Sequence, residues 1–279
     1  PRHILDAADC RVIGIDRDPE AVRRGRELEK ANPKFQMIEG RFGDIENLLR
    51  ENDIGRVDGF VLDIGVSSFQ LDQAERGFSF IQEGPLDMRM SQSGESAADI
   101  VNSYGEKEIA DILYRYGDER KSRRIAARII ERRQEKPFET TLDLAHTIES
   151  VLGHKRKPTD SHPATRSFQA LRIAVNDEMG ELESALDAGI NILKPGGRLV
   201  VVSFHSLEDR IVKRFLREKS GDIPRASRHM PVQMPKKTLY WFDCPERRAR
   251  ASSPGEIKDN IRARSAKLRY GIRTEHETD

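Results

Sequence analysis

The chain has 279 residues and a formal net charge of +1, with 37% hydrophobic and 34% charged residues. This composition predicts a folded protein with a sizeable core and a densely charged surface. Its longest apolar runs are too short to cross a bilayer, so no membrane association is expected. The first residues lack the apolar stretch of a secretory signal. Two cysteines, Cys10 and Cys244, build neither a disulfide framework nor a four-cysteine zinc site. We therefore expect a cytoplasmic protein that holds no metal.

Three short apolar segments near the start of the chain predict buried strands. They are Arg11–Asp16, Phe35–Glu39 and Val57–Asp63, and helical patterns separate them. Between the first two, Asp18-Pro19 supplies an N-cap residue and a first-turn proline for a helix that we expect to end near Ala31. Strands that alternate with helices at this spacing indicate a parallel α/β sheet.

The alternation of strands and helices stops between about Ser93 and His162, where helical patterns predominate. These patterns cover Glu106–Tyr116, Glu119–Glu135 and Leu142–Leu152. We therefore divide the chain into three parts. Residues 1–92 form the first part of an α/β domain, residues 93–162 a helical insertion, and residues 163–279 the second part of the α/β domain.

The α/β pattern resumes after the insertion. One long helix is predicted over 164–193, followed by a Lys-Pro-Gly-Gly turn and a strand of β-branched residues at Arg198–Ser203. Residues 220–237 have little periodicity and predict a loop. Beyond this loop, we expect Leu239–Phe242 and Ser265–Ile272 to close the sheet as an antiparallel pair.

Basic residues are clustered, although the net charge is close to zero. Residues 119–136 hold eight Lys and Arg against three Glu, and further clusters lie at 154–157, 247–250 and 262–269. A solvated helix face explains any single cluster as well as a ligand does, but several clusters favour a polyanionic partner. In the first cluster, four arginines recur every four residues, and we predict that they contact RNA: Arg120, Arg124, Arg128 and Arg132.

Two of the predicted strands end in an aspartate, at Asp16 and Asp63. In open α/β sheets, ligands bind beyond the carboxyl ends of the strands, where a carboxylate accepts hydrogen bonds from ribose hydroxyls. Asp18 is the better N-cap for the next helix, which leaves Asp16 for a ligand. This acid suits NAD and S-adenosylmethionine equally well. Further along, Met88 and Met90 either pack in the core or line a pocket for a flipped base.

Seven longer motifs follow one another along the chain. They are Asp-Ile-Gly-Val-Ser-Ser-Phe-Gln-Leu-Asp (63–72), Arg-Gly-Phe-Ser-Phe (76–80), Gly-Pro-Leu-Asp-Met-Arg-Met (84–90), Ser-His-Pro-Ala-Thr-Arg-Ser-Phe-Gln-Ala-Leu-Arg-Ile-Ala-Val-Asn (161–176), Lys-Pro-Gly-Gly-Arg-Leu (194–199), Ser-Phe-His-Ser-Leu-Glu-Asp-Arg (203–210) and Arg-Ala-Arg-Ser-Ala-Lys-Leu-Arg (262–269). From about Ile4 to Arg273, the chain resembles the bacterial 16S ribosomal RNA cytosine-N4 methyltransferase family (RsmH, also called MraW).

The resemblance implies a Rossmann-like methyltransferase sheet with an inserted helical domain that binds substrate. The implied activity transfers a methyl group from S-adenosylmethionine to the N4 amino group of a cytosine in the decoding region of 16S rRNA, in the small ribosomal subunit. By motif position, the implied cofactor contacts are Asp16, Phe42, Asp63 and Gln70. The ring of Phe42 suits this role, because adenine stacks on an aromatic face.

The catalytic groups are less defined than the cofactor contacts. A useful site accepts the amino hydrogens and aligns the nitrogen with the methyl group. Asp63, Asp87 and His205 are the candidates for this role. The stretch 63–66, Asp-Ile-Gly-Val, departs from the Asp/Asn-Pro-Pro-aromatic stretch of many amino-methyltransferases, which leaves the assignment open.

The family has a glycine-rich turn between its first strand and its first helix, and this sequence begins inside that helix, at Ile4–Ala8. We therefore expect the first strand and the glycine-rich loop to be missing from this chain, and cofactor binding to be weakened. Two alternatives remain, an NAD-dependent Rossmann oxidoreductase and a non-catalytic rRNA-binding or ribosome-assembly factor. The oligomeric state is open, with a dimer as one option.

Overall fold

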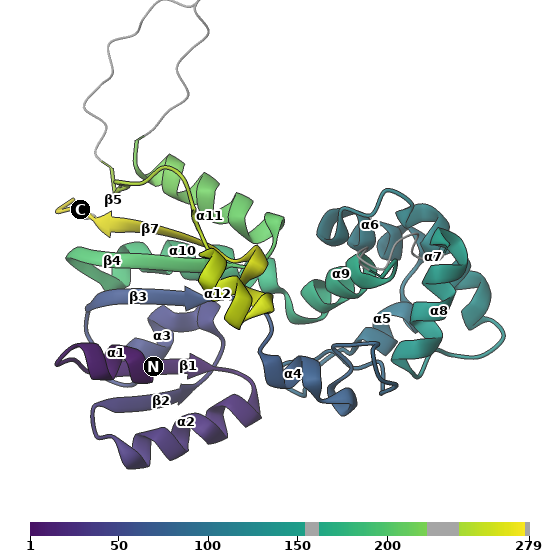
Figure 1. The fold of residues 1–279 in the computed structure, drawn as a ribbon, viewed down its shortest axis with the longest axis horizontal. Helices are drawn as coiled ribbons and strands as arrows, with labels where there is room; N and C mark the ends of the chain where they lie inside the picture. Colours follow the sequence, from purple (N-terminus) through teal and green to yellow (C-terminus); the bar gives the residue numbers. More distant parts are fainter. Residues whose placement is uncertain (154–161, 222–239, 277–279) are drawn as a thin grey trace, which may run out of the picture. The chain divides into compact units, whose positions relative to one another are not determined.

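The computed structural model describes residues 1–153, 162–221 and 240–276. The chain divides into two compact units, each built from segments that are far apart in sequence (Figure 1). The first unit contains Pro1–Glu39 and Val66–Glu178, and the second contains Gly40–Gly65 and Met179–Asp279. The basic cluster at 154–157 lies outside the described residues. So do all but the first two residues of the predicted loop at 220–237.

The first unit opens with a small parallel α/β element. Its parts are α1 (Arg2–Ala7), β1 (Val12–Asp16), α2 (Pro19–Ala31) and β2 (Phe35–Glu39). β1 pairs in parallel with β2, with Asp16 opposite Glu39. The side chain of Asp18 caps α2 by accepting a hydrogen bond from the Glu20 amide, and Pro19 fills the first turn. The predicted start and end of this helix are therefore confirmed.

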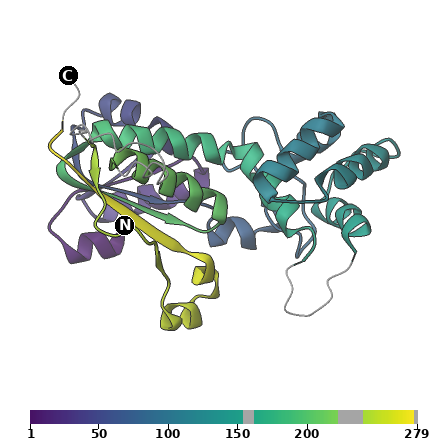
Figure 2. The same ribbon diagram turned by 90° about the horizontal axis from the view of Figure 1, so that it is seen from above.

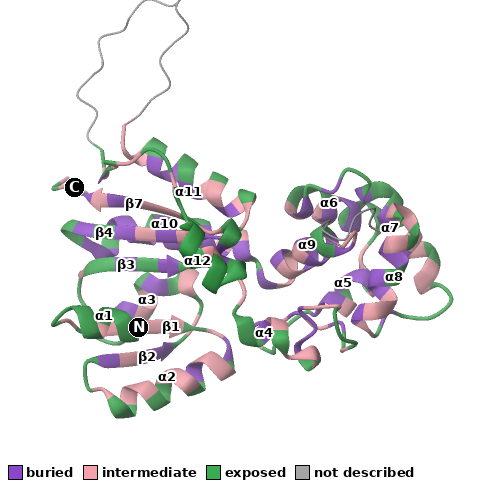
Figure 3. Ribbon diagram, viewed as in Figure 1, coloured by how far each residue is buried: buried purple, intermediate pink, exposed green. Residues whose placement is uncertain are grey.

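The remainder of the first unit is helical. It consists of α4 (Ser68–Asp72), η2 (Ala74–Arg76), α5 (Ala97–Ser103), α6 (Glu106–Gly117), α7 (Ser122–Arg133), α8 (Thr141–Leu152) and α9 (Thr165–Asn176). The buried faces of α5 to α9 meet in one apolar core, visible as the buried stretches of these helices in Figure 3. Phe78, Leu86 and Leu171 also belong to this core, so it extends beyond residues 93–162.

The prediction of one long helix over 164–193 is wrong. α9 ends at Asn176, α10 (Glu178–Ile192) begins two residues later, and Asp177 between them has φ +47°. The Asn176 side chain explains the break. Its Oδ1 accepts from the Met90 amide and its Nδ2 donates to the Met88 carbonyl. These bonds hold the end of α9 against the 84–90 segment, and aspartate tolerates the left-handed backbone that follows.

The second unit is a mixed sheet with helices. It contains η1 (Phe42–Asp44), α3 (Ile45–Glu51), β3 (Val57–Asp63), α10 from Met179 onward, β4 (Leu193–Ser203), α11 (Ser206–Lys219), β5 (Phe242–Asp243), β6 (Arg250–Ala251), α12 (Pro254–Asp259), η3 (Ile261–Ser265) and β7 (Lys267–Arg273). The strand order is β3-β4-β7-β5, and β6 also pairs with β7. β3 and β4 are parallel, whereas β7 is antiparallel to β4.

An antiparallel pair at this edge is present, because Phe242 of β5 pairs with Arg273 of β7. The strand β5 shares only Phe242 with the predicted Leu239–Phe242, of which Leu239 lies outside the described residues. The predicted Lys-Pro-Gly-Gly turn lies inside β4 as an irregularity. Leu193 pairs with Val57, and regular pairing resumes at Arg198 opposite Gly59. α12 and η3 form a largely exposed excursion between β6 and β7 (Figure 2).

A buried polar network holds the first unit together. Asp18 is 3% exposed, and its carboxylate accepts hydrogen bonds from Gln70 Nε2 at 2.7 Å and from Arg76 Nη1 at 3.2 Å. Arg76 Nη2 also lies 3.0 Å from Asp18 Oδ2 and donates to the carbonyls of Arg89 and Met90. The network therefore ties the start of α2 to the chain around η2 and to the 84–90 segment.

Replacing Arg76 by alanine is expected to lower the free energy of unfolding by about 3–5 kcal/mol, because it leaves the buried Asp18 carboxylate without its cation. Urea unfolding followed by circular dichroism measures the loss. Arg23→Ala is the matched control, because Arg23 forms exposed ion pairs with Glu20 and Glu27 and should have a much smaller effect. Equal losses in the two variants would contradict the importance of burial.

Candidate functional site

The four predicted cofactor contacts are divided between the two units. Asp16 and Gln70 belong to the first unit, and Phe42 and Asp63 to the second. In each unit, one contact lies at the carboxyl end of a parallel strand, β1 for Asp16 and β3 for Asp63. These are the strand ends at which open α/β sheets bind ligands.

Asp16 retains capacity for a ligand. Its Oδ1 accepts a hydrogen bond from the Asp18 amide at 2.9 Å, and an ionised carboxylate offers about four acceptor positions. Burial raises the pKa of Asp16 above the ordinary value of 3.8, against the opposing effect of the Asp18 amide. Because Asp18 caps α2, Asp16 is free of that task. The structure thus confirms Asp18 as the helix cap, and ligand binding by Asp16 stays a prediction.

Gln70 has a structural use in this unit. Its Oε1 accepts from the Ser67 amide at 2.9 Å in the capping box of α4, and its Nε2 donates to Asp18. The side chain is almost fully buried. Gln70 therefore acts on Asp16 through Asp18, and a direct cofactor contact at Gln70 stays a prediction.

Phe42 begins the short helix η1 and is half-buried. Glu181 of α10 binds the residues that precede and follow Phe42. Its Oε1 lies 2.7 Å from Arg41 Nε, and its Oε2 accepts from the Gly43 amide at 2.9 Å. A Cβ at residue 43 would lie 2.8 Å from that carboxylate oxygen and 3.1 Å from the Glu181 backbone, so a larger residue would displace the Glu181 side chain from this bond. Glu181 is thus the residue that orients Phe42.

Asp63 ends β3, where the chain leaves the sheet. The Ile64 amide makes one further hydrogen bond, to the Val202 carbonyl of β4, and Gly65 then turns with φ +108°. Partial burial raises the pKa of the Asp63 carboxyl above its ordinary 3.8. An acid in this setting ionises less readily than a fully solvated one, so it accepts a proton more readily at mildly acidic pH.

Asp87, a second catalytic candidate, forms an ion pair with Arg89. Burial alone would raise the pKa of Asp87, but hydrogen bonds from Arg89 outweigh it and leave the pKa below 3.8. Arg89 Nη2 lies 2.6 Å from Asp87 Oδ2. A carboxylate in this ion pair is a weak base, although it still accepts hydrogen bonds. Met88 and Met90 beside it belong to the helical core, which favours packing over a base pocket for both.

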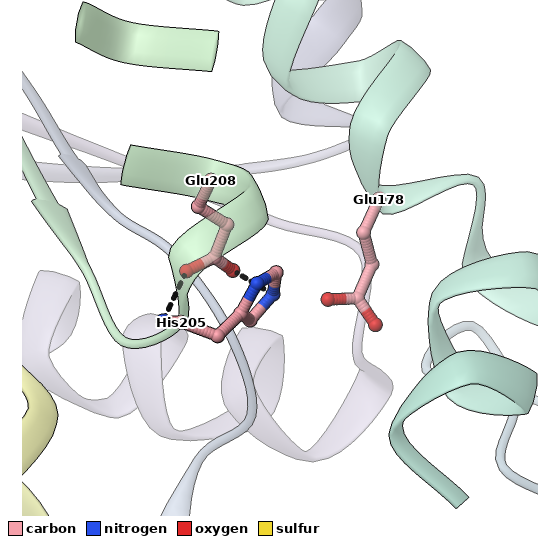
Figure 4. A group of neighbouring side chains, drawn as sticks. All are labelled: Glu178, His205 and Glu208. Carbon is pink, nitrogen blue, oxygen red and sulfur yellow. Dashed lines mark hydrogen bonds and ion pairs between the residues drawn. The ribbon is translucent and has the colours of Figure 1, made fainter. Parts of the chain in front are cut away.

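His205, the third catalytic candidate, precedes α11 and packs beside Glu208 (Figure 4). Its Nε2 lies 2.9 Å from Glu208 Oε1, and Glu208 Oε2 accepts from the amides of Phe204 and His205. Neither imidazole nitrogen has an aligned hydrogen-bond partner in the described structure, so the contact with Glu208 is an ion pair only when the imidazole is protonated. Glu208 thereby fixes the His205 backbone at the start of the helix.

The four arginines that were predicted to contact RNA have different surroundings, with Arg120 in the connection before α7 and the other three on α7. Arg128 pairs with Glu131 at 2.7 Å, and Arg132 pairs with Asp143 of α8 at 2.8 Å. Arg120 and Arg124 are exposed and make no ion pair within the described part of the chain. The predicted stripe therefore has one half bound to protein carboxylates and one half turned to solvent.

An open hollow of about 380 Å³ lies in the second unit, lined by the end of α3, residues 53–56 and the end of α10. It precedes β3, at the opposite end of that strand from Asp63. Because ligands bind at the carboxyl ends of such strands, this hollow is a poor candidate for the cofactor site.

Four positioning residues were missed from the sequence, namely Asp18 as an ion-pair acceptor, Arg76, Asn176 and Glu181. Arg76 and Asn176 occur in the motifs at 76–80 and 161–176, so those motifs marked them without stating their roles. No sequence signal marked Glu181, because a glutamate on a helix is ordinary and its partners are 138 positions or more away along the chain.

Each unit thus has a carboxylate at the carboxyl end of a parallel strand, the position at which α/β proteins of the nucleotide-binding type hold their ligands. Residues 2–273 match the model of the MraW methylase family. The chain belongs to this family of methylases.

Curated relatives share the match over most of their length. A protein of Hyphomonas neptunium named "Ribosomal RNA small subunit methyltransferase H" is 55% identical over 97% of this chain and 79% of its own length. Proteins with the same name from Paramagnetospirillum magneticum and Rhodospirillum rubrum are each 55% identical over 98% of this chain, covering 86% and 85% of their own lengths.

Removing Glu181 is expected to loosen the turn that carries Phe42. In Glu181→Ala, the Gly43 amide loses its acceptor and Arg41 its partner, so the amide should exchange with solvent faster by about 5-fold or more. Hydrogen exchange with mass spectrometry measures this. Glu183→Ala is the matched control, because Glu183 lies on the same helix in an exposed pair with Arg214. Unchanged protection in Glu181→Ala would show that the turn is held by other contacts.

Proposed function

We propose that this protein transfers a methyl group from S-adenosylmethionine to the N4 amino group of a cytosine in the decoding region of 16S rRNA. The observation that carries the proposal is the methylase-family match across residues 2–273. The relatives' name specifies the small-subunit rRNA as their substrate. The further specification of cytosine N4 rests on the resemblance of the chain, through all seven motifs between residues 63 and 269, to the cytosine-N4 methyltransferase family.

The residues fit S-adenosylmethionine as the methyl donor. Asp16 offers an acceptor for ribose hydroxyls, and the half-buried ring of Phe42 offers a face for adenine. The bound donor would supply an electrophilic methyl group on a sulfonium. Asp18 and Gln70 orient Asp16, and Glu181 orients Phe42.

The protein's task in the transfer is positioning. The N4 lone pair of cytosine is delocalised into the ring, so a hydrogen-bond acceptor that holds the amino hydrogens aligns the nitrogen for in-line attack. We assign this acceptor to Asp63, whose raised pKa also suits it to take the proton that the product loses. Asp87 is an acceptor already paired with Arg89, and His205 is held at the start of α11. Both remain proposals for supporting roles.

The proposed partner is the RNA of the small ribosomal subunit, and the proposed location is the cytoplasm. In the described part of the chain, no helix is both long enough and apolar enough to span a membrane. The oligomeric state stays open.

Mapping of modified cytosines in small-subunit rRNA tests the proposal. Deleting the gene is expected to remove one N4-methyl group from a cytosine of the decoding region, detected by mass spectrometry of RNA fragments. Reintroducing the gene should restore the methyl group, and reintroducing Asp63→Ala should not. An unchanged cytosine pattern after deletion would refute the proposed activity.

Replacing Asp16 by asparagine is expected to weaken binding of S-adenosylhomocysteine by about 10-fold or more, because a charged acceptor is lost while the shape is kept. The pKa of Asp16 is raised, so acid protonates it earlier than an ordinary aspartate. Wild-type affinity should therefore fall as the pH is lowered from 7 towards about 5, and the variant should lack this component. Calorimetry at several pH values measures both effects, and parallel pH profiles would contradict the role of Asp16.

A further inference from the structure

A cationic surface forms where α6 turns into α7. We call it the α6–α7 corner, and it consists of Tyr114, Arg115, Arg120, Lys121, Arg123, Arg124 and the neighbouring Arg166. All seven residues are exposed and belong to the first unit. Four of the six cations of the corner lie within the five residues 120–124.

The geometry of the corner is fixed by its buried residues. α6 ends at Gly117 and α7 begins at Ser122, so four residues connect the two helices. The carboxylate of Glu119, which is buried, accepts from the Lys121 amide at 2.9 Å. A Cβ at Gly117 would lie 2.7 Å from the Arg166 carbonyl oxygen. The last turn of α6, the first turn of α7 and the start of α9 are thus held side by side.

The cations of the corner have no carboxylate partner in the described residues, unlike those further along α7. Arg128 and Arg132 are in ion pairs, and Arg133 donates to the carbonyls of Val101 and Tyr104. Acidic residues at the far end of α6, Glu106 and Glu108, lie in its first turn. One exposed acid, Asp118, lies in the connection itself. The remaining charge, together with the positive end of the α7 dipole, makes the corner attractive to phosphate groups.

Tyr114 supplies an aromatic face within this charge. It is 62% exposed on the last turn of α6, next to Arg115. Exposed aromatic rings beside cations are the means by which proteins hold unpaired nucleic-acid bases, because every base has a face to stack on and the cations hold the backbone. A duplex cannot use this feature, since its bases are already stacked inside the helix. The combination therefore favours a single strand.

We propose that the α6–α7 corner binds single-stranded RNA, with Tyr114 stacked on an unpaired base and the surrounding cations on the flanking phosphates. The choice of RNA as the partner rests on the proposed function. The stacking role of Tyr114 and the phosphate contacts of Arg115, Lys121, Arg123 and Arg166 go beyond it.

The first test compares the variants Tyr114→Ala and Tyr114→Phe with the wild-type protein, each expressed from the whole gene. The probe is a fluorescein-labelled oligouridylate of about 12 nucleotides, which is in the range that single-strand sites cover. Fluorescence anisotropy should show affinity about 5- to 150-fold weaker for Tyr114→Ala, as expected for the loss of one stacked base. Tyr114→Phe keeps the ring and should bind like the wild type. Binding of a perfectly paired RNA duplex should be the same for all three proteins.

Several outcomes would overturn the proposal. Wild-type affinity in Tyr114→Ala removes the stacking contact. Equal losses in Tyr114→Ala and Tyr114→Phe assign the contact to the hydroxyl group rather than the ring. An equal loss on duplex and single strand removes the preference for unpaired bases, and RNA affinity that none of the variants changes would point to a protein partner for this surface.

The second test measures the cations. In Arg120→Ala with Arg124→Ala, the slope of log affinity against log salt should fall by about 1.4, because two phosphate contacts to a single strand are lost. Arg26→Ala is the matched control, since Arg26 is exposed but paired with Glu29, and its slope should not change. An unchanged slope in the double variant overturns the phosphate contacts.

The failure of this proposal differs from a failure of the proposed function. Calorimetry of S-adenosylhomocysteine with Tyr114→Ala should give the wild-type affinity, because Tyr114 contacts RNA only. Loss of RNA affinity in the variants, combined with an unchanged cytosine pattern after gene deletion, would retain the corner as an RNA surface and reject the methylation activity. Unchanged RNA affinity in the variants, combined with loss of the cytosine methyl group after gene deletion, would reject the corner as an RNA surface and retain the methylation activity.

Discussion

The first unit depends on one buried carboxylate, that of Asp18. It caps α2, and it accepts hydrogen bonds from Gln70 and Arg76, which come from segments 52 and 58 positions further along the chain. Through Arg76 the network reaches the carbonyls of the 84–90 segment, and through Asn176 that segment is joined to the end of α9. Since an unpaired charge at this depth is costly, the chain keeps all of these partners in place together.

This arrangement gives Asp16 a fixed orientation without using its full acceptor capacity. Asp16 accepts one hydrogen bond from the backbone of Asp18, whereas the side chain of Asp18 forms the ion pair with Arg76. Glu181 plays the corresponding part in the second unit, where it holds Arg41 and Gly43 on either side of Phe42. In both units, a buried acid fixes the backbone next to a residue that is proposed to contact the methyl donor.

The arginines of α7 differ in their contacts between the two halves of the helix. In the second half of α7, the arginines pair with Asp143 of α8 and with Glu131 or donate to backbone carbonyls. The first half leaves its cations in solvent beside Tyr114. A four-residue repeat of arginine in the sequence does not distinguish these two uses, because both satisfy the same helical spacing.

The sequence by itself determined the local elements and the family. Asp18-Pro19 set the start of α2, apolar runs set β1, β2 and β3, and the motifs set the expectation of a methyltransferase, because capping, periodicity and motif spacing are all properties of neighbouring residues. Tertiary structure alone decided the break at Asp177, the burial of Gln70 and the role of Glu181. Each depends on partners that are distant along the chain, such as Asn176 with Met88 and Met90. Periodicity carries no information on such pairs. A polar residue takes on a structural role when the fold brings a buried hydrogen-bond partner next to it, wherever that partner lies in the sequence.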